Sequence, residues 1–473
     1  MLVYNFKYEL KILYRNRWVQ LLTVLLLVLF VFAGYNGKQR VDKRMGDIQA
    51  AQTMVELSDA KTLANLKAIE NGEDLGLSNW IIPTYPMNVG NLSPRLVAMP
   101  ANEMAFMATG QSDIYTHFVM PTVFGDDFAI NVSEMSSPIQ LLFGSFDLVF
   151  VVVYLLPLII IAFSYNILSE EKERGSLRLL ASQPISIRLW VLQKIGVRLF
   201  WMLLIIFLVT ALVFLLNTIN SWDGFVTFLV SCSVYMFFWF TLAFAVNITV
   251  GKSVQNAFAL LGFWIVFVLL IPSGVNQLSD NLYPIPPRSE LINEVREHKA
   301  EATKMQDEIL DNFLRDHPEY AMSEGEQSRS FWHNYMASQE VVKTQLEPLL
   351  FEYEKNLGLR HQWVDKLQWV SPAILTQQAL VSRAGTSKID YENFWKQASQ
   401  FGEIWKGYFI PMLYTNQTFT SSHFQELPEF KYDFKSHRIF DVRVFGVLLL
   451  TVLIMLLTAL KYKLSKKKNE IIL

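Results

Sequence analysis

The chain has 473 residues, of which 52% are hydrophobic and only 18% are charged, whereas soluble domains carry about 25% charged residues. The formal net charge of −2 gives no indication of nucleic-acid binding. A single cysteine, Cys232, excludes a disulfide within the chain and a cysteine-based zinc site. Charge is nearly absent from six windows, which predicts a mainly α, polytopic protein with a six-helix membrane domain rather than a soluble enzyme with buried helices.

Residues 1–17 combine apolar and basic side chains ahead of the first apolar window. The apolar positions, which can share one helical face, are Leu2, Val3, Phe6, Leu10 and Leu13; the basic positions are Lys7, Lys11 and Arg15. This pattern predicts an amphipathic helix lying in the cytoplasmic interface of the membrane. An ordinary basic flank is the alternative.

Residues 18–35 are the first predicted span. A cleaved signal peptide is the alternative, because Val31-Phe32-Ala33 resembles a cleavage site. The long basic lead and the length of the apolar run favour the span.

Residues 36–140 form a first insertion. It opens with apolar residues at helical spacing, which predict a helix continuing from the span: Val41, Met45, Ile48, Ala51 and Val55. Asn71-Gly72 should end this helix, and residues 73–140 should be irregular with short strands.

Four further spans follow before the second insertion, at 141–165, 189–216, 225–247 and 254–272. The span at 141–165 has Asp147 near its start and Pro157 inside it. The fifth span is the weakest, because its apolar core of 15 residues, Ala257 to Ile271, covers only about 23 Å of a bilayer core of about 30 Å. Pro272 is predicted to end it, and a partly re-entrant segment is the alternative.

Residues 273–438 form a second, largely helical insertion. One helix is expected from Ser289 to Asp316. Ser323 with Glu326 gives a capping-box pattern for another helix that runs to Asn356 with a kink at Pro348, and the two should form an antiparallel hairpin. Asp390 is predicted to cap a later helix through Tyr408. The sixth span, 442–460, and a basic tail, 461–473, end the chain.

Positive charge in short flanking segments marks the cytoplasmic side of a membrane protein. Lysine and arginine gather before the first span, in the segment 166–188 and after the sixth span, whereas the segment between the third and fourth spans has neither. Both termini are therefore predicted in the cytoplasm. The two insertions are then extracytoplasmic.

The sequence lacks the motifs of several enzyme classes. Gly251-Lys252-Ser253 is not a phosphate-binding loop, because Val246 occupies the position where the motif requires glycine. Neither H-E-x-x-H nor G-x-S-x-G occurs, so no cofactor is predicted for this chain. Ionisable residues in or beside the spans are functional candidates, with capping or snorkelling as the alternative; they are Asp147, Lys194, Arg198 and Arg443.

The segment between the second and third spans carries a specific pattern. It reads Glu-Glu-Lys-Glu-Arg-Gly-Ser-Leu-Arg-Leu-Leu-Ala-Ser-Gln-Pro over 170–184, with Lys194 entering the next span. Gly175 permits a sharp turn and Ser176 can cap a short helix. Leu177, Leu180 and Ala181 would share one face of that helix, and Pro184 would end it. A plain loop on the membrane surface is the alternative.

This segment resembles the signature of ABC-2 type permeases. Similar motifs at Gly144 to Asp147, Gly110 to Asp113 and Ser371 to Ala373 resemble a subgroup with large domains between spans 1 and 2 and between spans 5 and 6, so the resemblance covers most of the chain. It implies a location in the bacterial inner membrane and a coupling helix that docks into a groove on a separate ATPase. The implied coupling residues are Glu171, Glu173, Gly175, Ser176, Leu177, Leu180 and Pro184.

The resemblance also implies partners: a dimer of ABC ATPase subunits that holds ATP and Mg, a second permease copy or close homologue, and the lipid bilayer. An extracytoplasmic protein is a further candidate partner. The expected function is export of an unidentified substrate, driven by the separate ATPase. The alternative is a mechanotransmitting or assembly subunit that relays ATPase motion to its outer domains without moving substrate. A membrane enzyme is a third reading that lacks a catalytic constellation.

Overall fold

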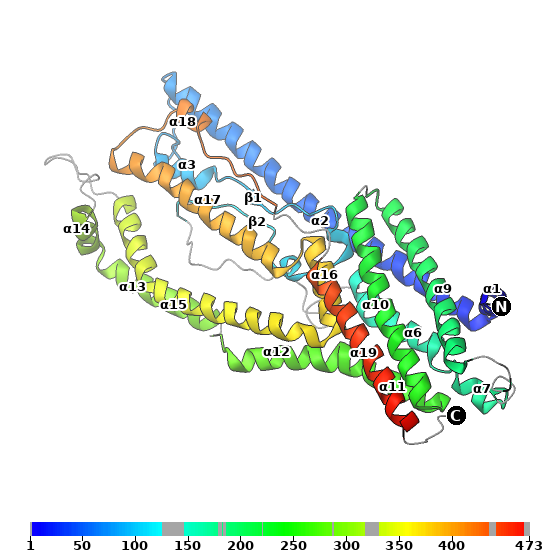
Figure 1. Ribbon diagram of the computed structural model, residues 1–473. Coiled ribbons are helices and arrows are strands. Elements are labelled where there is room, and N and C mark those ends of the chain that lie inside the picture. The colour runs from blue at the N-terminus through cyan, green and yellow to red at the C-terminus, as the bar shows by residue number, and fades with distance from the viewer. Residues whose placement is uncertain are drawn as a thin grey trace.

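The computed structural model describes residues 2–124, 146–177, 182, 186–219, 221–285, 288–316, 331–434 and 441–467. Within these ranges the chain is mainly α, and six helices are long and apolar enough to cross a membrane. The predicted fold class, a multi-pass protein with a six-helix membrane domain, is therefore confirmed. Figure 1 shows the membrane helices gathered at one end of the molecule and the two insertions extending from the other.

The six spans have the following bounds. Span 1 is the first part of α2 (Arg17–Glu70). Span 2, Leu148–Glu173, consists of α5 (Leu148–Phe150), the π-helical turn η3 (Val151–Leu155), α6 (Leu156–Ser164) and α7 (Ser169–Glu173). Spans 3 and 4 are α9 (Ile187–Leu216) and α10 (Trp222–Thr249). Span 5, Ser253–Leu282, consists of α11 (Ser253–Trp264), the π-helical turn η4 (Ile265–Leu270) and α12 (Ile271–Leu282). Span 6 is the first part of α19 (Val442–Lys467).

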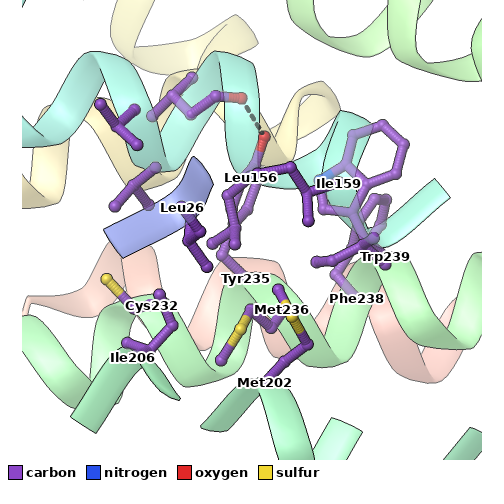
Figure 2. Packing of buried hydrophobic residues seen from close by; sticks show 14 of the residues in the cluster. Leu26, Leu156, Ile159, Met202, Ile206, Cys232, Tyr235, Met236, Phe238 and Trp239 are labelled. Carbon is purple, nitrogen blue, oxygen red and sulfur yellow. Dashed lines mark hydrogen bonds between the residues drawn. The ribbon is translucent and has the colours of Figure 1, made fainter. Parts of the chain in front are cut away.

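Spans 2 and 4 form the centre of the bundle. We compare the most apolar stretch of each span. In that stretch 67% of the residues are buried in span 2 and 61% in span 4, compared with 17% in span 5 and 22% in span 6. Figure 2 shows this core, in which Tyr235 and Trp239 of α10 share one cluster with Leu156 and Ile159 of α6. The outer spans leave most of their apolar side chains exposed, as suits contact with lipid.

A short helix, α1 (Leu2–Arg15), precedes span 1 and packs against α9. Asn16 separates the two N-terminal helices, and its side chain accepts a hydrogen bond from the Trp18 amide at 3.0 Å, which caps the start of α2. Leu13 is buried against the bundle, whereas Lys11 and Arg15 are exposed. One face of this amphipathic helix therefore packs against the bundle, and the opposite face is exposed.

Span 2 starts its described helix at Leu148, with Asp147 as the cap; the predicted start at 141 lies outside the described residues. Pro157 has no N–H and directly follows a π-helical turn in which the Leu156 amide bonds to the Val151 carbonyl, so the carbonyls after Val151 are short of a donor. A carbonyl inside a bilayer has no water to replace that donor. The Tyr235 hydroxyl, from α10, donates to the Val153 carbonyl at 3.0 Å and supplies the missing bond.

The prediction that Pro272 ends span 5 is wrong, since the helix continues through it to Leu282. The turn before Pro272 is π-helical, with the Ile271 amide bonded to the Val266 carbonyl. In that register the proline leaves the Phe267 carbonyl free, and the Ser371 hydroxyl donates to it at 2.6 Å. The 30 residues of span 5 reach about 45 Å, which is ample for a bilayer core of about 30 Å.

The first insertion continues span 1 without a break. α2 runs to Glu70 and Asn71 caps its end, as the sequence predicted. The irregular part contains α3 (Pro86–Leu92), the short helices η1 (Ala105–Met107) and η2 (Gln111–Ile114), and a two-stranded antiparallel sheet. Its strands are β1 (Val97–Ala98) and β2 (Phe118–Val119), and Val97 pairs with Val119.

The second insertion is helical. It contains α13 (Arg288–Lys304), α14 (Gln306–Asp316), α15 (Phe331–Leu367), η6 (Gln368–Val370), α16 (Pro372–Ala384), α17 (Lys388–Tyr414) and α18 (Ser421–Gln425). α13 and α14 both pack on α15, which confirms the hairpin, although a break at Met305 divides its first arm. α15 extends beyond Asn356 and includes Pro348. The proposed capping box at Ser323 lies outside the described residues.

The start of α17 corrects the predicted cap. Ser387, rather than Asp390, is the N-cap residue, and Asp390 closes the capping box from the third helical position. The helix also continues past Tyr408 to Tyr414. Trp405 and Phe409 of α17 are fully buried in a core shared with α2 and α3, so the two insertions form one packed unit.

Candidate functional site

Span 2 is interrupted near the end of the bundle where α1 and α7 lie side by side with α9 (Figure 1). α6 ends at Ser164, residues 165–168 form a turn, and α7 begins at Ser169. A helix that ends inside a bundle leaves carbonyl groups without donors. The break therefore requires polar side chains from neighbouring spans.

Three consecutive carbonyls at the break each accept a hydrogen bond from a different span. The pairs are Arg198 of α9 with Phe163 at 2.5 Å, Asn247 of α10 with Ser164 at 2.8 Å, and Asn256 of α11 with Tyr165 at 3.0 Å. The Asn247 side-chain oxygen also accepts from the Leu168 amide at 3.3 Å, on the other side of the turn. Spans 3, 4 and 5 thus satisfy the carbonyls that the interruption of span 2 leaves free.

Glu171 connects α7 to span 3 and to α1. Its carboxylate lies 3.1 Å from the Lys194 ammonium, which also lies 3.5 Å from Glu9. The Lys194 ammonium sits 4.2 Å from the centre of the Trp190 ring, a cation–π contact. One lysine therefore joins three elements that are far apart in the sequence, and its side chain is only 14% exposed.

Glu173 connects α7 to the start of span 5. Its two carboxylate oxygens accept from the Ser253 amide at 2.8 Å and the Ser253 hydroxyl at 2.9 Å. The Ser253 hydroxyl is also 2.9 Å from that of Ser169. A carboxylate at the first turn of a helix satisfies a free N–H and complements the helix dipole. Displacement of α7 would therefore act directly on span 5.

Gly175 has a φ of +77°, the left-handed conformation that glycine adopts without strain. The Ser176 hydroxyl donates to the Glu171 carboxylate, which anchors the turn to α7. The helix that Ser176 was expected to cap, with Leu180 and Pro184, lies outside the described residues. Leu177 is buried, at 9% exposure, and its implied role in docking stays a prediction.

Asp147 lies at the opposite end of span 2. Its carboxylate accepts from the Phe150 amide at 2.7 Å and from the Thr109 amide at 2.6 Å. It therefore caps span 2 and ties it to the first insertion, which is the capping role that the sequence left open as an alternative. Gly110 lies close by, and a Cβ there would stand 1.8 Å from the Thr386 carbonyl oxygen, so the two insertions meet each other in close backbone contact beside the end of span 2.

Charged side chains of α2 also contact the irregular part of the first insertion. Arg40 donates to the Ala105 carbonyl at 2.6 Å, and Arg44 pairs with Asp113 at 3.4 Å. Burial, and after it the charges of Arg44 and Arg40, lower the pKa of His117 to about 3. Hydrogen bonds and ion pairs thus fasten α2 to the irregular part of the first insertion.

Several residues of the site were not recognised from the sequence. Neither Asn247 nor Asn256 was singled out as a functional candidate. The available signal was an amide side chain inside an apolar span, where burial requires hydrogen-bond partners. Within the described residues, no cluster of His, Cys, Asp and Glu could hold a metal ion.

The fold and site define a multi-pass membrane protein. At one end of its bundle, polar side chains of spans 3, 4 and 5 bind the interrupted part of span 2. A family model for a domain of unknown function, DUF3526, matches residues 288–433. This range begins with α13 and extends past α18, so the match covers the second insertion and none of the spans. Comparison with curated proteins and with solved structures gives no match.

Proposed function

We propose that this chain is the membrane subunit of an ABC-type exporter and that a separate ATPase subunit supplies the energy. The observation that carries the proposal concerns α7, the last five residues of span 2, which a turn separates from the rest of that span. Side chains connect it to α1, span 3 and span 5 instead. Such a segment can take up a force applied from outside the membrane and distribute it to several spans.

The proposal has a physical basis in two features: the turn at 165–168 can change its conformation, and the contacts of α7 with other elements are directional. A turn can change its dihedral angles more readily than a continuous helix, and interrupted helices are common where membrane transporters move. The ion pair of Glu171 with Lys194 is partly shielded from solvent, and the exposed cap made by Glu173 is directional because both its oxygens accept from Ser253. Movement of α7 would therefore be transmitted to Lys194 and Ser253 rather than dissipated.

In this proposal the α7 end of the bundle faces the cytoplasm of a bacterium, and the chain resides in the inner membrane. The basic residues that flank spans 1, 2, 3 and 6 support this orientation. Both termini are then cytoplasmic and both insertions extracytoplasmic.

The orientation predicts the labelling of single cysteines placed at exposed positions in a Cys232→Ala background. A membrane-impermeant maleimide added to intact cells should label Glu56→Cys and Glu352→Cys, both on exposed insertion surfaces, and should not label Ser182→Cys. All three should react after permeabilisation, which controls for accessibility. Labelling of position 182 in intact cells would reverse the proposed topology.

The proposed complex contains two ATPase subunits, which carry ATP and Mg, and a second permease copy or close homologue. The chain is proposed to be no enzyme by itself, because its sequence has no phosphate-binding loop. We expect the purified chain to show no magnesium-dependent ATP hydrolysis and to co-purify with an ATPase when expressed with its genomic neighbours. Robust hydrolysis by the chain free of other polypeptides would contradict the proposal.

A second candidate function is transmission of ATPase motion to the insertions without passage of substrate through the membrane. It is favoured by α2, whose 54 residues run from the α7 end of span 1 to the far end of the first insertion without a break. Ser371 supports it too, because it joins the π-helical turn of span 5 to the start of α16. An extracytoplasmic protein would then be the target of the motion.

A further inference from the structure

A cavity of about 790 Å³ lies between α1 and the first turns of span 3. α1 contributes Phe6, Tyr8, Glu9 and Ile12; α9 contributes Trp190, Gln193, Lys194, Gly196 and Val197; α7 contributes Glu171. The volume is within the range of about 300–1,000 Å³ that is usual for small-molecule sites. None of the contacts described so far fills it.

The cavity has an apolar part and a charged part. Phe6, Ile12 and Val197 provide apolar surface, whereas two carboxylates, Glu9 and Glu171, face the single ammonium of Lys194. The nearby Arg198 is directed to the Phe163 carbonyl at the break in span 2. The lining itself carries two carboxylates for one ammonium, and Arg198 adds a second positive charge near Glu9, so a cationic group would be bound by the carboxylate oxygens and not by a net charge of the region.

The position of the cavity limits what can enter it. α1 is an amphipathic helix beside the end of a span, the depth at which lipid headgroups meet acyl chains. Phospholipids are the most concentrated molecules at that depth. An occupant with a cationic head and an apolar tail matches both parts of the lining.

We propose that this cavity binds a phospholipid with a primary ammonium headgroup, of the phosphatidylethanolamine class. The ammonium would lie against Glu9 and Glu171, and Tyr8 and Gln193 could donate hydrogen bonds to the phosphate. An acyl chain would follow Phe6 and Val197. The proposal depends on the membrane domain alone and not on the transport function.

The test is native mass spectrometry of the detergent-solubilised, delipidated full-length chain, titrated with three lipids of identical acyl chains. Phosphatidylethanolamine should bind about tenfold more tightly than phosphatidylglycerol or phosphatidylcholine, because only its headgroup donates charge-assisted N–H bonds to carboxylates. Glu9→Gln should remove that preference, since it removes one of the two carboxylates that would accept from the lipid ammonium.

Gly196→Leu should narrow the cavity at its lining and weaken the preferred binding. A Cβ at Gly196 meets nothing within 4 Å, so the variant should fold. Gly262→Leu is the matched control, because Gly262 also lies in a span with open space around it and is far from the cavity in sequence and element. It should retain wild-type lipid preference.

Equal affinity of the wild-type chain for the three lipids would overturn the proposal, because it would indicate ordinary annular lipid. Unchanged preference in Glu9→Gln would overturn it even if Gly196→Leu failed to fold. Weak binding of every lipid, with loss of ATPase capture in Glu9→Gln, would assign the cavity to a protein partner instead.

Discussion

Gly37→Ala should destabilise this protein strongly, by about 3 kcal/mol or more, because the added methyl group has no room. Gly37 lies in α2 just beyond span 1, and a Cβ there would stand 1.9 Å from the carbonyl oxygen of Phe106. That oxygen belongs to the backbone of η1 and cannot rotate away. α2 and η1 would have to separate, and the contacts of Arg40 with this segment would be lost.

The control is in the same helix. Gly46→Ala adds the same methyl group where nothing lies within 4 Å, and alanine should stabilise a helix interior by about 0.5–1 kcal/mol. Thermal unfolding in detergent should therefore show a clear fall in Tm for Gly37→Ala and an unchanged or slightly raised Tm for Gly46→Ala. Similar Tm values for the two variants would mean that α2 and η1 are not packed as described.

Gly175→Val should uncouple the proposed ATPase from the membrane domain without preventing assembly. Valine in the left-handed region costs on the order of 1–3 kcal/mol, so the backbone at φ +77° should change conformation. The residues that follow would then leave α7 in a different direction. The measurement is the change in ATP hydrolysis rate that the chain imposes on its ATPase partner, which we expect to fall about tenfold.

Gly175→Asn provides the matched comparison, because asparagine tolerates the left-handed conformation. It should retain most of the coupling, whereas a general requirement for a small side chain would impair both variants equally. Wild-type coupling in Gly175→Val would show that this turn does not direct the coupling segment. Both variants should be recovered with the ATPase in equal amounts, since neither changes a buried contact.

Local sequence determined much of the architecture. Six apolar windows were sufficient for the six spans, because each must satisfy its own backbone in lipid. The helix that extends span 1 to Asn71, and the hairpin of α13, α14 and α15, followed from helical periodicity and from capping residues. Gly175 was expected at a sharp turn, and its positive φ agrees with that expectation.

Tertiary structure decided the features that depend on distant donors. Pro272 ends a helix in isolation, yet span 5 continues because a π-helical turn and the hydroxyl of Ser371, about a hundred residues later, satisfy the backbone. The break in span 2 persists because Asn247 and Asn256 reach its free carbonyls. Leu177 has an apolar pattern that suits a docking face, but only packing decided that it is buried. Sequence periodicity reports which residues share a face; it does not report which distant polar group will complete a hydrogen bond.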